Sequence, residues 1–234
     1  MPTTFVLVHS PLVGPLTWSP VAAVLRQRGV DTMTPILHDD DATDRPYWTQ
    51  HVAAVTQAID GVPPEHTLVL VGHSGAGPLL PAIGHVSNHR IGAYLFVDAA
   101  FPLDGRSRLA DMEADDPELA GQLRQHLAGG GRFPTWRDED LRDAIPDDRL
   151  RQGMVAELRP RPLAFFEEPI PSFANRSNSP YGYLHFSSPY AKVADRAQQA
   201  GWAYRHIDAG HFHMLVDPAG VADTLVDLVH TLNG

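Results

Sequence analysis

Residues 67–77, TLVLVGHSGAG, place a serine where it could act as a nucleophile. Five of the six residues from Thr67 to Gly72 are β-branched or leucine, which is typical of a strand buried on both faces. Ser74 follows that strand, and Gly72, Gly75 and the small residues after them predict a sharp turn into a helix. Such a turn lifts the hydroxyl clear of the sheet edge. Ser74 is therefore the candidate nucleophile, and the alternative is a turn serine that only caps the next helix.

A serine hydroxyl is barely ionised at neutral pH, so this chemistry needs a base within hydrogen-bond reach. His211 follows the last predicted strand and precedes the last predicted helix, and it comes after the serine in the chain. It is our candidate base, although thirteen histidines leave room for one that merely sits on a loop. His213 forms an HxH pair with it, but no third ligand has metal-site spacing, so no metal is expected. His73 is expected to point away from Ser74, because neighbouring side chains diverge at a sharp turn.

The elements that must position these residues alternate along the chain. Strands are predicted at residues 5–9, 31–36, 67–72, 92–98, 181–187 and 203–207, and helices at 18–28, 47–59, 192–200 and 218–232. Thr17 is expected to cap the first helix and Gly29 to end it. This alternation predicts the α/β class, with a doubly wound, mostly parallel sheet that binds ligands at the carboxyl ends of its strands.

Residues 101–178 interrupt the alternation. This segment is rich in Asp, Arg, Gly and Pro, and it shows no convincing core strand. Helical pieces are predicted within it at residues 117–127, 138–145 and 147–158. So long an interruption predicts a helical lid, inserted after the strand that ends near Asp98. The core then comprises residues 1–100 and 179–234.

The lid carries a set of large apolar side chains: Phe133, Trp136, Met154, Phe165 and Phe166. We expect them to form a small core of the lid, and the alternative is that they roof an apolar pocket. The acidic runs at 39–41 and 147–148 are interpreted as solvated charges of a loop and of a helix start.

Four motifs occur in a characteristic order and spacing: FVLVHS followed by a tryptophan, GHSGAG, LFVDAAFP and GHFHMLVDP. Together they resemble the α/β-hydrolase superfamily across the whole chain, and most closely its branch of small esterases and hydroxynitrile lyases. The resemblance implies a cofactor-free enzyme in which Ser74 attacks, His211 acts as the base and a carboxylate orients His211.

The acid is where this chain departs from the family pattern. The usual carboxylate follows the strand before the last, which here ends HFSSPYAK and reaches no acid before Asp195 in a predicted helix. Asp98 closes the preceding strand on the same face and is the preferred substitute, although an aspartate there can also be structural. Asp208, Asp195 and a Ser74–His211 dyad without an acid stay open.

The oxyanion hole departs from the pattern as well. One donor is expected from the backbone N–H of Gly75, and the family's second donor would fall on Pro11, which has no N–H. The second donor must then come from Leu12, from the Ser10 hydroxyl, or be missing. Losing one donor costs about 3 kcal/mol of transition-state stabilisation, which argues against ordinary fast ester hydrolysis.

The composition and net charge limit which kinds of binding partner are expected. The 234 residues are 43% hydrophobic and 20% charged, as expected for one globular domain with an insertion. The net charge of −10 disfavours nucleic acid and anionic membranes as partners. The absence of cysteine excludes disulfides and thiolate chemistry. The N-terminal residues show no signal-peptide pattern, so a cytoplasmic location is expected, and a homodimer stays open.

These observations lead to three hypotheses for the function. The leading one is a serine hydrolase for a small, largely apolar ester or related carbonyl compound. The second is a lyase, cyclase or dehydratase of natural-product metabolism that uses the Ser/His pair for acid–base chemistry, because proton shuttling needs no oxyanion hole. The third is a small-molecule-binding protein with a slow triad.

Overall fold

A computed structural model describes residues 2–102, 104–171, 173 and 179–233, and in this part of the chain six strands form one parallel sheet. The strands are β1 (Thr3–Val8), β2 (Asp31–Met33), β3 (Thr67–His73), β4 (Ile91–Val97), β5 (Tyr181–His185) and β6 (Ala203–His206). Their spatial order is β2-β1-β3-β4-β5-β6, and every neighbouring pair is parallel. The predicted α/β class with a parallel sheet is confirmed.

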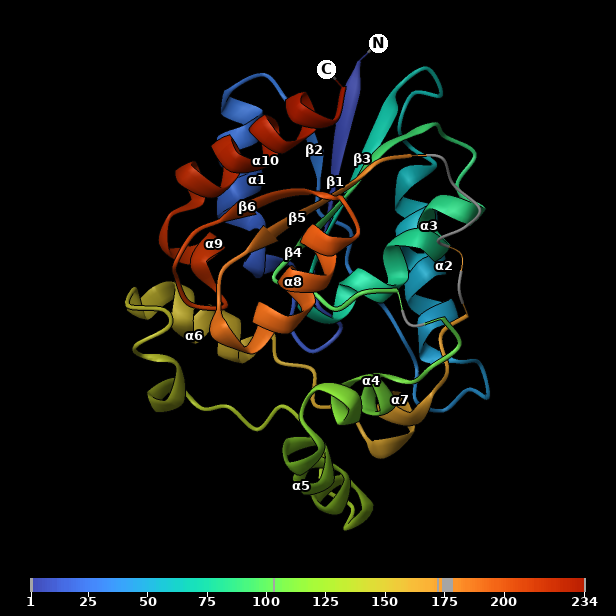
Figure 1. The fold of residues 1–234 in the computed structure, drawn as a ribbon, viewed down its shortest axis with the longest axis vertical. Helices are drawn as coiled ribbons and strands as arrows, with labels where there is room; N and C mark the ends of the chain where they lie inside the picture. The colour runs from blue at the N-terminus through green and yellow to red at the C-terminus, as the bar shows by residue number, and fades with distance from the viewer. Residues whose placement is uncertain (1, 103, 172, 174–178, 234) are drawn as a thin grey trace.

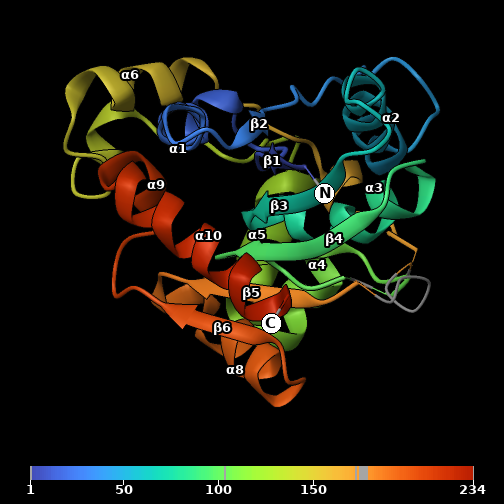
Figure 2. The ribbon, with the colours of Figure 1, turned by 90° about the horizontal axis from the view of Figure 1, so that it is seen from above.

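Helices cover both faces of this sheet (Figures 1 and 2). One face is covered by α1 (Ser19–Gln27) and α10 (Pro218–Asn233), and the other by α2 (Tyr47–Ile59), α3 (Leu80–Val86) and α8 (Ala191–Gln199). Successive side chains of a strand point to opposite faces, so β1 sends Phe5 and Leu7 into one core cluster and Val6 and Val8 into the other. Both faces are apolar, which explains the near-continuous hydrophobic runs in the sequence.

The turn after β3 differs from an ordinary helix start. A 3-10 helix, Ser74–Leu79, comes first, and α3 begins only at Leu80. A side chain at position 77 would collide with the carbonyl oxygen of Ala100, so the turn requires glycine there. The small residues after Ser74 therefore let this helix start lie against the end of β4.

The segment between β4 and β5 contributes no strand to the sheet in its described part. It contains α4 (Arg108–Asp115), α5 (Pro117–Ala128), α6 (Asp148–Ala156) and α7 (Leu163–Glu167). Figure 1 shows α4, α5 and α7 together at the end of the molecule toward which the strands run. Phe165 and Phe166 form a small core there with Leu109 and Leu127. Met154, which we expected in that core, packs into the core of the sheet instead.

Several local predictions need correction. Thr17 does not cap α1: it ends a 3-10 turn and donates its hydroxyl to the carbonyl of Gly14 at 2.8 Å. The helix predicted at 138–145 is only a 3-10 turn, Asp138–Leu141. Helix α4 was not predicted, although Ser107 caps it by accepting the N–H of Ala110 at 3.1 Å.

Asp39 corrects the expectation of a solvated acidic loop. Its carboxylate lies 2.6 Å from the Arg161 guanidinium and 2.5 Å from His51 Nε2, and all three side chains are nearly buried. Burial alone would raise the pKa of Asp39, but the hydrogen bonds from His51 and Arg161 hold it well below its usual range. This ion pair ties the loop after β2 to the segment between β4 and β5.

No helix in the described part of the chain combines the length and the apolar character needed to cross a membrane.

Candidate active site

Ser74 stands at the point where β3 turns into the 3-10 helix, and its backbone has a φ of 55°. This is the left-handed region, which costs a residue with a side chain about 1–2 kcal/mol. Strain of this kind persists only where the surrounding structure enforces it, and it concentrates at functional sites. The side chain is 9% exposed and lines a cavity.

His211 and Asp98 meet at the carboxyl edge of the sheet, where Asp98 directly follows β4. The Nδ1 atom of His211 lies 2.7 Å from Asp98 Oδ2. Asp98 is fully buried, and its backbone also has a left-handed φ, 42°. The sequence favoured Asp98 and left open Asp195, Asp208 and a Ser74–His211 dyad without an acid. The carboxylate bonded to His211 is that of Asp98, while Asp195 and Asp208 are exposed.

The Asp98 carboxylate is held by a full set of donors. The backbone N–H groups of Phe186 and Ser187 donate to Oδ1 at 2.9 and 3.0 Å, and the Ser187 hydroxyl donates to Oδ2 at 2.5 Å. Burial alone would raise the pKa of Asp98, but these bonds and the one from His211 bring that pKa below its usual value. Asp98 is therefore ionised at neutral pH.

His73 braces the loop that carries His211. Its Nε2–H donates to the carbonyl of His211 at 3.0 Å, and the two rings lie 4.4 Å apart. Burial lowers the pKa of His73 well below its usual value, so this ring is neutral. Its ring also packs against those of Trp18 and Phe212, at 6.2 and 5.8 Å. His213 packs against the ring of Phe186 at 5.5 Å.

Tyr190 is a residue that the sequence reasoning missed. Its hydroxyl lies 3.1 Å from Ser74 Oγ, and its ring stacks on that of His211 with centroids 5.0 Å apart and planes at 4°. A lone tyrosine in SSPYAK gives no signal of such a contact, because 116 residues separate it from Ser74.

The other flank of Ser74 holds the candidates for the oxyanion hole. A Cβ built on Gly75 would lie 3.2 Å from Ser10 Oγ and 3.5 Å from Pro11 Cδ, so both residues stand beside Gly75. The backbone N–H of Leu12 donates to the Ser10 hydroxyl over a long 3.4 Å. The three predicted participants, Gly75, Ser10 and Leu12, each have an N–H or O–H donor, whereas Pro11 has no N–H.

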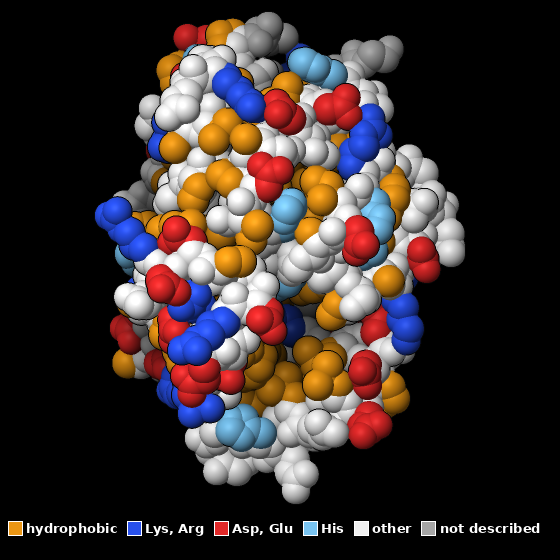
Figure 3. Space-filling view, turned by 90° about the vertical axis from the view of Figure 1, so that its left-hand side faces the viewer, with side chains coloured by type: hydrophobic (Ala, Val, Ile, Leu, Met, Phe, Trp, Pro, Cys, Tyr) orange, Lys and Arg blue, Asp and Glu red, His pale blue; other side chains and the backbone are white. Residues whose placement is uncertain are grey.

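A cavity of about 300 Å³ opens in front of Ser74. The apolar part of its lining consists of Leu12, Pro78, Ala100, Met112, Leu119, Phe166, Pro189 and Val193. Its charged lining comes from Arg108, Asp111, Asp115 and Asp116 at the lid side. Figure 3 shows a hollow with hydrophobic walls toward the end of the molecule where α4 and α5 lie. Phe166 fits both hypotheses for the aromatic side chains of this segment. It packs in the small apolar core with Leu109 and Leu127, and it also lines the cavity.

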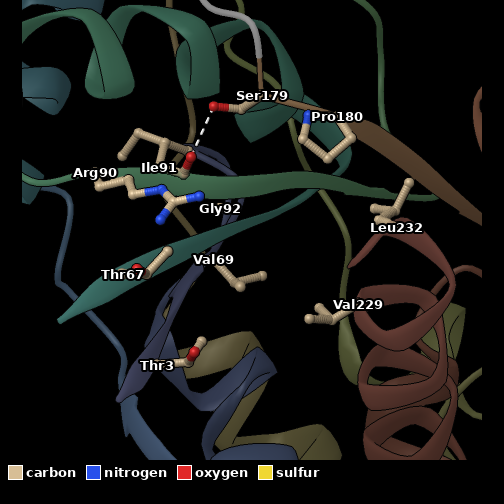
Figure 4. Close-up of a pocket in the computed structure, with 10 residues that line it drawn as sticks. All are labelled: Thr3, Thr67, Val69, Arg90, Ile91, Gly92, Ser179, Pro180, Val229 and Leu232. Atoms are coloured by element: carbon tan, nitrogen blue, oxygen red, sulfur yellow. Dashed lines mark hydrogen bonds between the residues drawn. The ribbon is translucent and has the colours of Figure 1, made fainter. Parts of the chain in front are cut away.

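A larger cavity, about 550 Å³, lies at the opposite end of the sheet (Figure 4). Thr3 and Thr67, the first residues of β1 and β3, line it, and the Ser179 hydroxyl beside it donates to the carbonyl of Ile91 at 2.7 Å. Its described lining includes none of the candidate residues. We therefore assign the site to the smaller cavity, which contains Ser74 and Gly75.

Within the described residues, no three His, Asp or Glu side chains are grouped so that they could hold a metal ion.

Comparison with solved structures identifies the fold. An extracellular α/β-hydrolase from a Paenibacillus species is 23% identical to this chain, over 97% of this chain and 99% of that one, with a TM-score of 0.77. The protein has the α/β-hydrolase fold. A pyrethroid hydrolase from Sphingobium faniae shares it at 16% identity over 98% of each chain, with a TM-score of 0.73. Tomato methylketone synthase I shares it at 14% identity over 99% and 98% of the two chains, with a TM-score of 0.72.

No protein-family model and no curated protein matches the chain by sequence. In the α/β-hydrolase fold, the nucleophile stands on a strained turn from strand to helix, and the acid and the histidine follow it along the chain. Ser74 follows β3, Asp98 follows β4 and His211 lies in the loop after β6, so the three residues occur in that order along the chain. The fold therefore accounts for where these residues lie, and their chemistry is argued from their geometry.

Proposed function

We propose that this protein is a cofactor-free serine hydrolase that acts on a small, largely apolar ester or related carbonyl compound. The observation that carries the proposal is the 2.7 Å contact between His211 Nδ1 and the buried Asp98 carboxylate, at the sheet edge where Ser74 is held in a left-handed turn. An ionised Asp98 can only accept a hydrogen bond, so Nδ1 carries the proton. The Nε2 atom of His211 is then left free to act as a base.

In the proposed reaction, Ser74 Oγ attacks the carbonyl carbon while His211 Nε2 takes the serine proton. The Gly75 N–H and the Ser10 hydroxyl stabilise the oxyanion, since they lie together beside the nucleophile. His211 returns the proton to the leaving-group oxygen, and the acyl-enzyme forms. Water then repeats the sequence with the same base and releases the acid.

The cavity supports a small substrate. About 300 Å³ is at the lower end of the range for ligand pockets, and the lining near Ser74 is mainly apolar. A pyrethroid hydrolase among the structural neighbours is consistent with an apolar substrate for this one.

The cytoplasmic location and a homodimer stay predictions, which cell fractionation and light scattering would test.

A second candidate function is a lyase, cyclase or dehydratase of natural-product metabolism. Two observations favour it: the Ser74 hydroxyl is bonded to Tyr190, and Pro11 has no N–H where a second oxyanion donor is expected. Both would be tolerated by an enzyme that moves protons without forming a tetrahedral oxyanion. The structural neighbours include a histidine-to-alanine variant of tomato methylketone synthase I in complex with β-ketoheptanoate. A binding protein with a slow triad is the third candidate.

Labelling with a fluorophosphonate, followed by intact-mass measurement, separates these candidates. The wild-type protein is expected to gain one label rapidly, and Ser74→Ala and His211→Ala are expected to gain none. His206→Ala, on an exposed side chain at the end of β6, is the control and should label like the wild type. A folded wild-type protein that does not label would reject the acyl-enzyme and favour the lyase or binding candidates.

A further inference from the structure

Tyr190 contacts both groups that carry the proposed chemistry. Its hydroxyl is 3.1 Å from Ser74 Oγ, and its ring lies parallel to the His211 imidazole at 5.0 Å. It also lines the cavity in which a substrate would sit. A hydroxyl in this position touches the nucleophile directly.

The backbone of Tyr190 is linked by hydrogen bonds to the carboxylate that holds His211. Tyr190 ends the 3-10 turn Ser188–Tyr190, and its backbone N–H donates to the carbonyl of Ser187 at 3.0 Å. Ser187 in turn donates both its N–H and its hydroxyl to Asp98. The position of Tyr190 therefore follows from the structure around the acid.

Strand order places Tyr190 on a defined side of the nucleophile. Ser10 follows β1, which pairs with β3 on one side, whereas Tyr190 and His211 follow β5 and β6 on the other. Gly75 and Ser10 lie together on the first side, where the oxyanion is proposed to form. The leaving group must lie on the second side, because His211 has to reach its oxygen.

The protonation state of the phenol decides what it can do there. Burial raises the pKa of Tyr190 to about 12, so the hydroxyl keeps its proton at neutral pH. A neutral phenol can donate a hydrogen bond to an oxygen that gains negative charge.

From these placements we infer that Tyr190 is a catalytic residue that donates a hydrogen bond to the leaving-group oxygen of the ester. The inference rests on the proposed function. In the acylation step, the bond from Ser74 Oγ to the carbonyl carbon forms and the bond from that carbon to the leaving-group oxygen breaks. His211 carries the serine proton to that oxygen, and Tyr190 keeps its own proton throughout. Before the ester binds, the Tyr190 hydroxyl is bonded to Ser74, and the ester replaces this bond.

Two esters with the same acyl group test this role, one with an alkyl leaving group and one with a nitrophenyl leaving group. Tyr190→Phe removes the hydroxyl and keeps the ring that stacks on His211. We expect it to lower kcat/KM for the alkyl ester about 10- to 100-fold, as the loss of a hydrogen bond to a charged oxygen does. The nitrophenyl ester should change less than about threefold, because its leaving group departs without help.

Two further measurements make the result decisive. Tyr204→Phe, which removes a hydroxyl bonded to His185 Nδ1 outside the cavity, should leave both rates unchanged. Tyr190→Phe should still label with a fluorophosphonate, which reports a folded and activated Ser74. Equal losses on both esters, or no loss on the alkyl ester, would overturn the role of Tyr190. A wild-type protein that neither labels nor turns over either ester would instead reject the proposed function, and this role with it.

Discussion

The Nδ1 atom of His211 lies 2.7 Å from Asp98 Oδ2, although 113 residues separate the two in the chain. Asp98 stands at the end of β4, and His211 stands in the loop after β6. Because Asp98 is ionised and can only accept, the contact selects the tautomer of His211 that carries its proton on Nδ1. The carboxylate therefore orients the base that the proposed chemistry needs.

Asp98→Asn should test this relationship. The amide fills nearly the same volume, but its NH₂ group can donate to Nδ1 and would favour the wrong tautomer of His211. We expect kcat to fall by about 10³- to 10⁴-fold, with KM little changed. Asp208→Asn is the control. Its carboxylate is exposed and lies close to His211 in the sequence, so this variant should keep full activity. Ester hydrolysis measured for both variants at the same pH decides whether Asp98 is the acid.

The same variant should change how stability depends on pH. The folded-state pKa of Asp98 is lowered, so its ionised form stabilises the fold above the unfolded-state pKa of about 3.9. That contribution is lost as the pH falls through the lower, folded-state pKa. The difference in the free energy of unfolding between wild type and Asp98→Asn should therefore shrink from pH 6 toward acid. Urea titrations at several pH values measure it, and a constant difference would contradict the assignment.

Pro11→Ala should raise the rate of ester hydrolysis. The Cδ atom of Pro11 takes the place of an amide hydrogen, and it lies 3.5 Å from a Cβ built on Gly75. An alanine would direct an N–H toward the proposed oxyanion hole, so we expect kcat to rise about tenfold or more. Pro15→Ala, at the first position of a 3-10 turn in the same loop, is the matched control. An unchanged kcat in Pro11→Ala would mean that an N–H at position 11 adds nothing to the two proposed donors, the Gly75 N–H and the Ser10 hydroxyl.

At position 74, glycine should be no less stabilising than alanine, which reverses the order of stability found at most positions. Ser74 has a φ of 55°, which glycine adopts freely and alanine does not. We expect Ser74→Gly to be at least as stable as Ser74→Ala. Ala53→Gly, on the exposed side of α2, should instead cost about 1 kcal/mol. Urea unfolding of the three variants compares them, and a Ser74→Ala protein clearly more stable than Ser74→Gly would argue against strain at the turn.

The features that were predicted correctly from the sequence are those that local residue patterns determine. Helix α2 was predicted at 47–59 and is found at those residues, and Gly29, with a φ of 77°, ends α1 as expected. The sequence could not decide which carboxylate contacts His211, because Asp98 and His211 are brought together only when the sheet folds. Tyr190 was missed for the same reason. Helix α4 was missed although Ser107 gave a capping signal, since the Asp-rich composition around it resembles a loop.

The buried pair of Arg108 and Glu168 should control the stability of the cavity wall. The two side chains are 2.9 Å apart and about nine-tenths buried, and Glu168 also accepts the N–H groups of Tyr47 and Trp48 at the start of α2. Burial raises the pKa of Glu168 above its usual value despite these partners. Arg108→Met would leave that charge unpaired and should cost about 3–5 kcal/mol of the free energy of unfolding.

The pH dependence of this loss identifies its cause. A group whose folded-state pKa is raised favours the fold below its unfolded-state pKa, and it loses that advantage as the pH rises through the folded-state pKa. The destabilisation of Arg108→Met should therefore grow from about pH 4 to pH 7. Asp223→Asn, which breaks an exposed pair with Arg28, should cost at most about 1 kcal/mol at any pH. A pH-independent loss in Arg108→Met would point to lost packing of the guanidinium on the Phe165 ring, 4.1 Å away, rather than to the charge of Glu168.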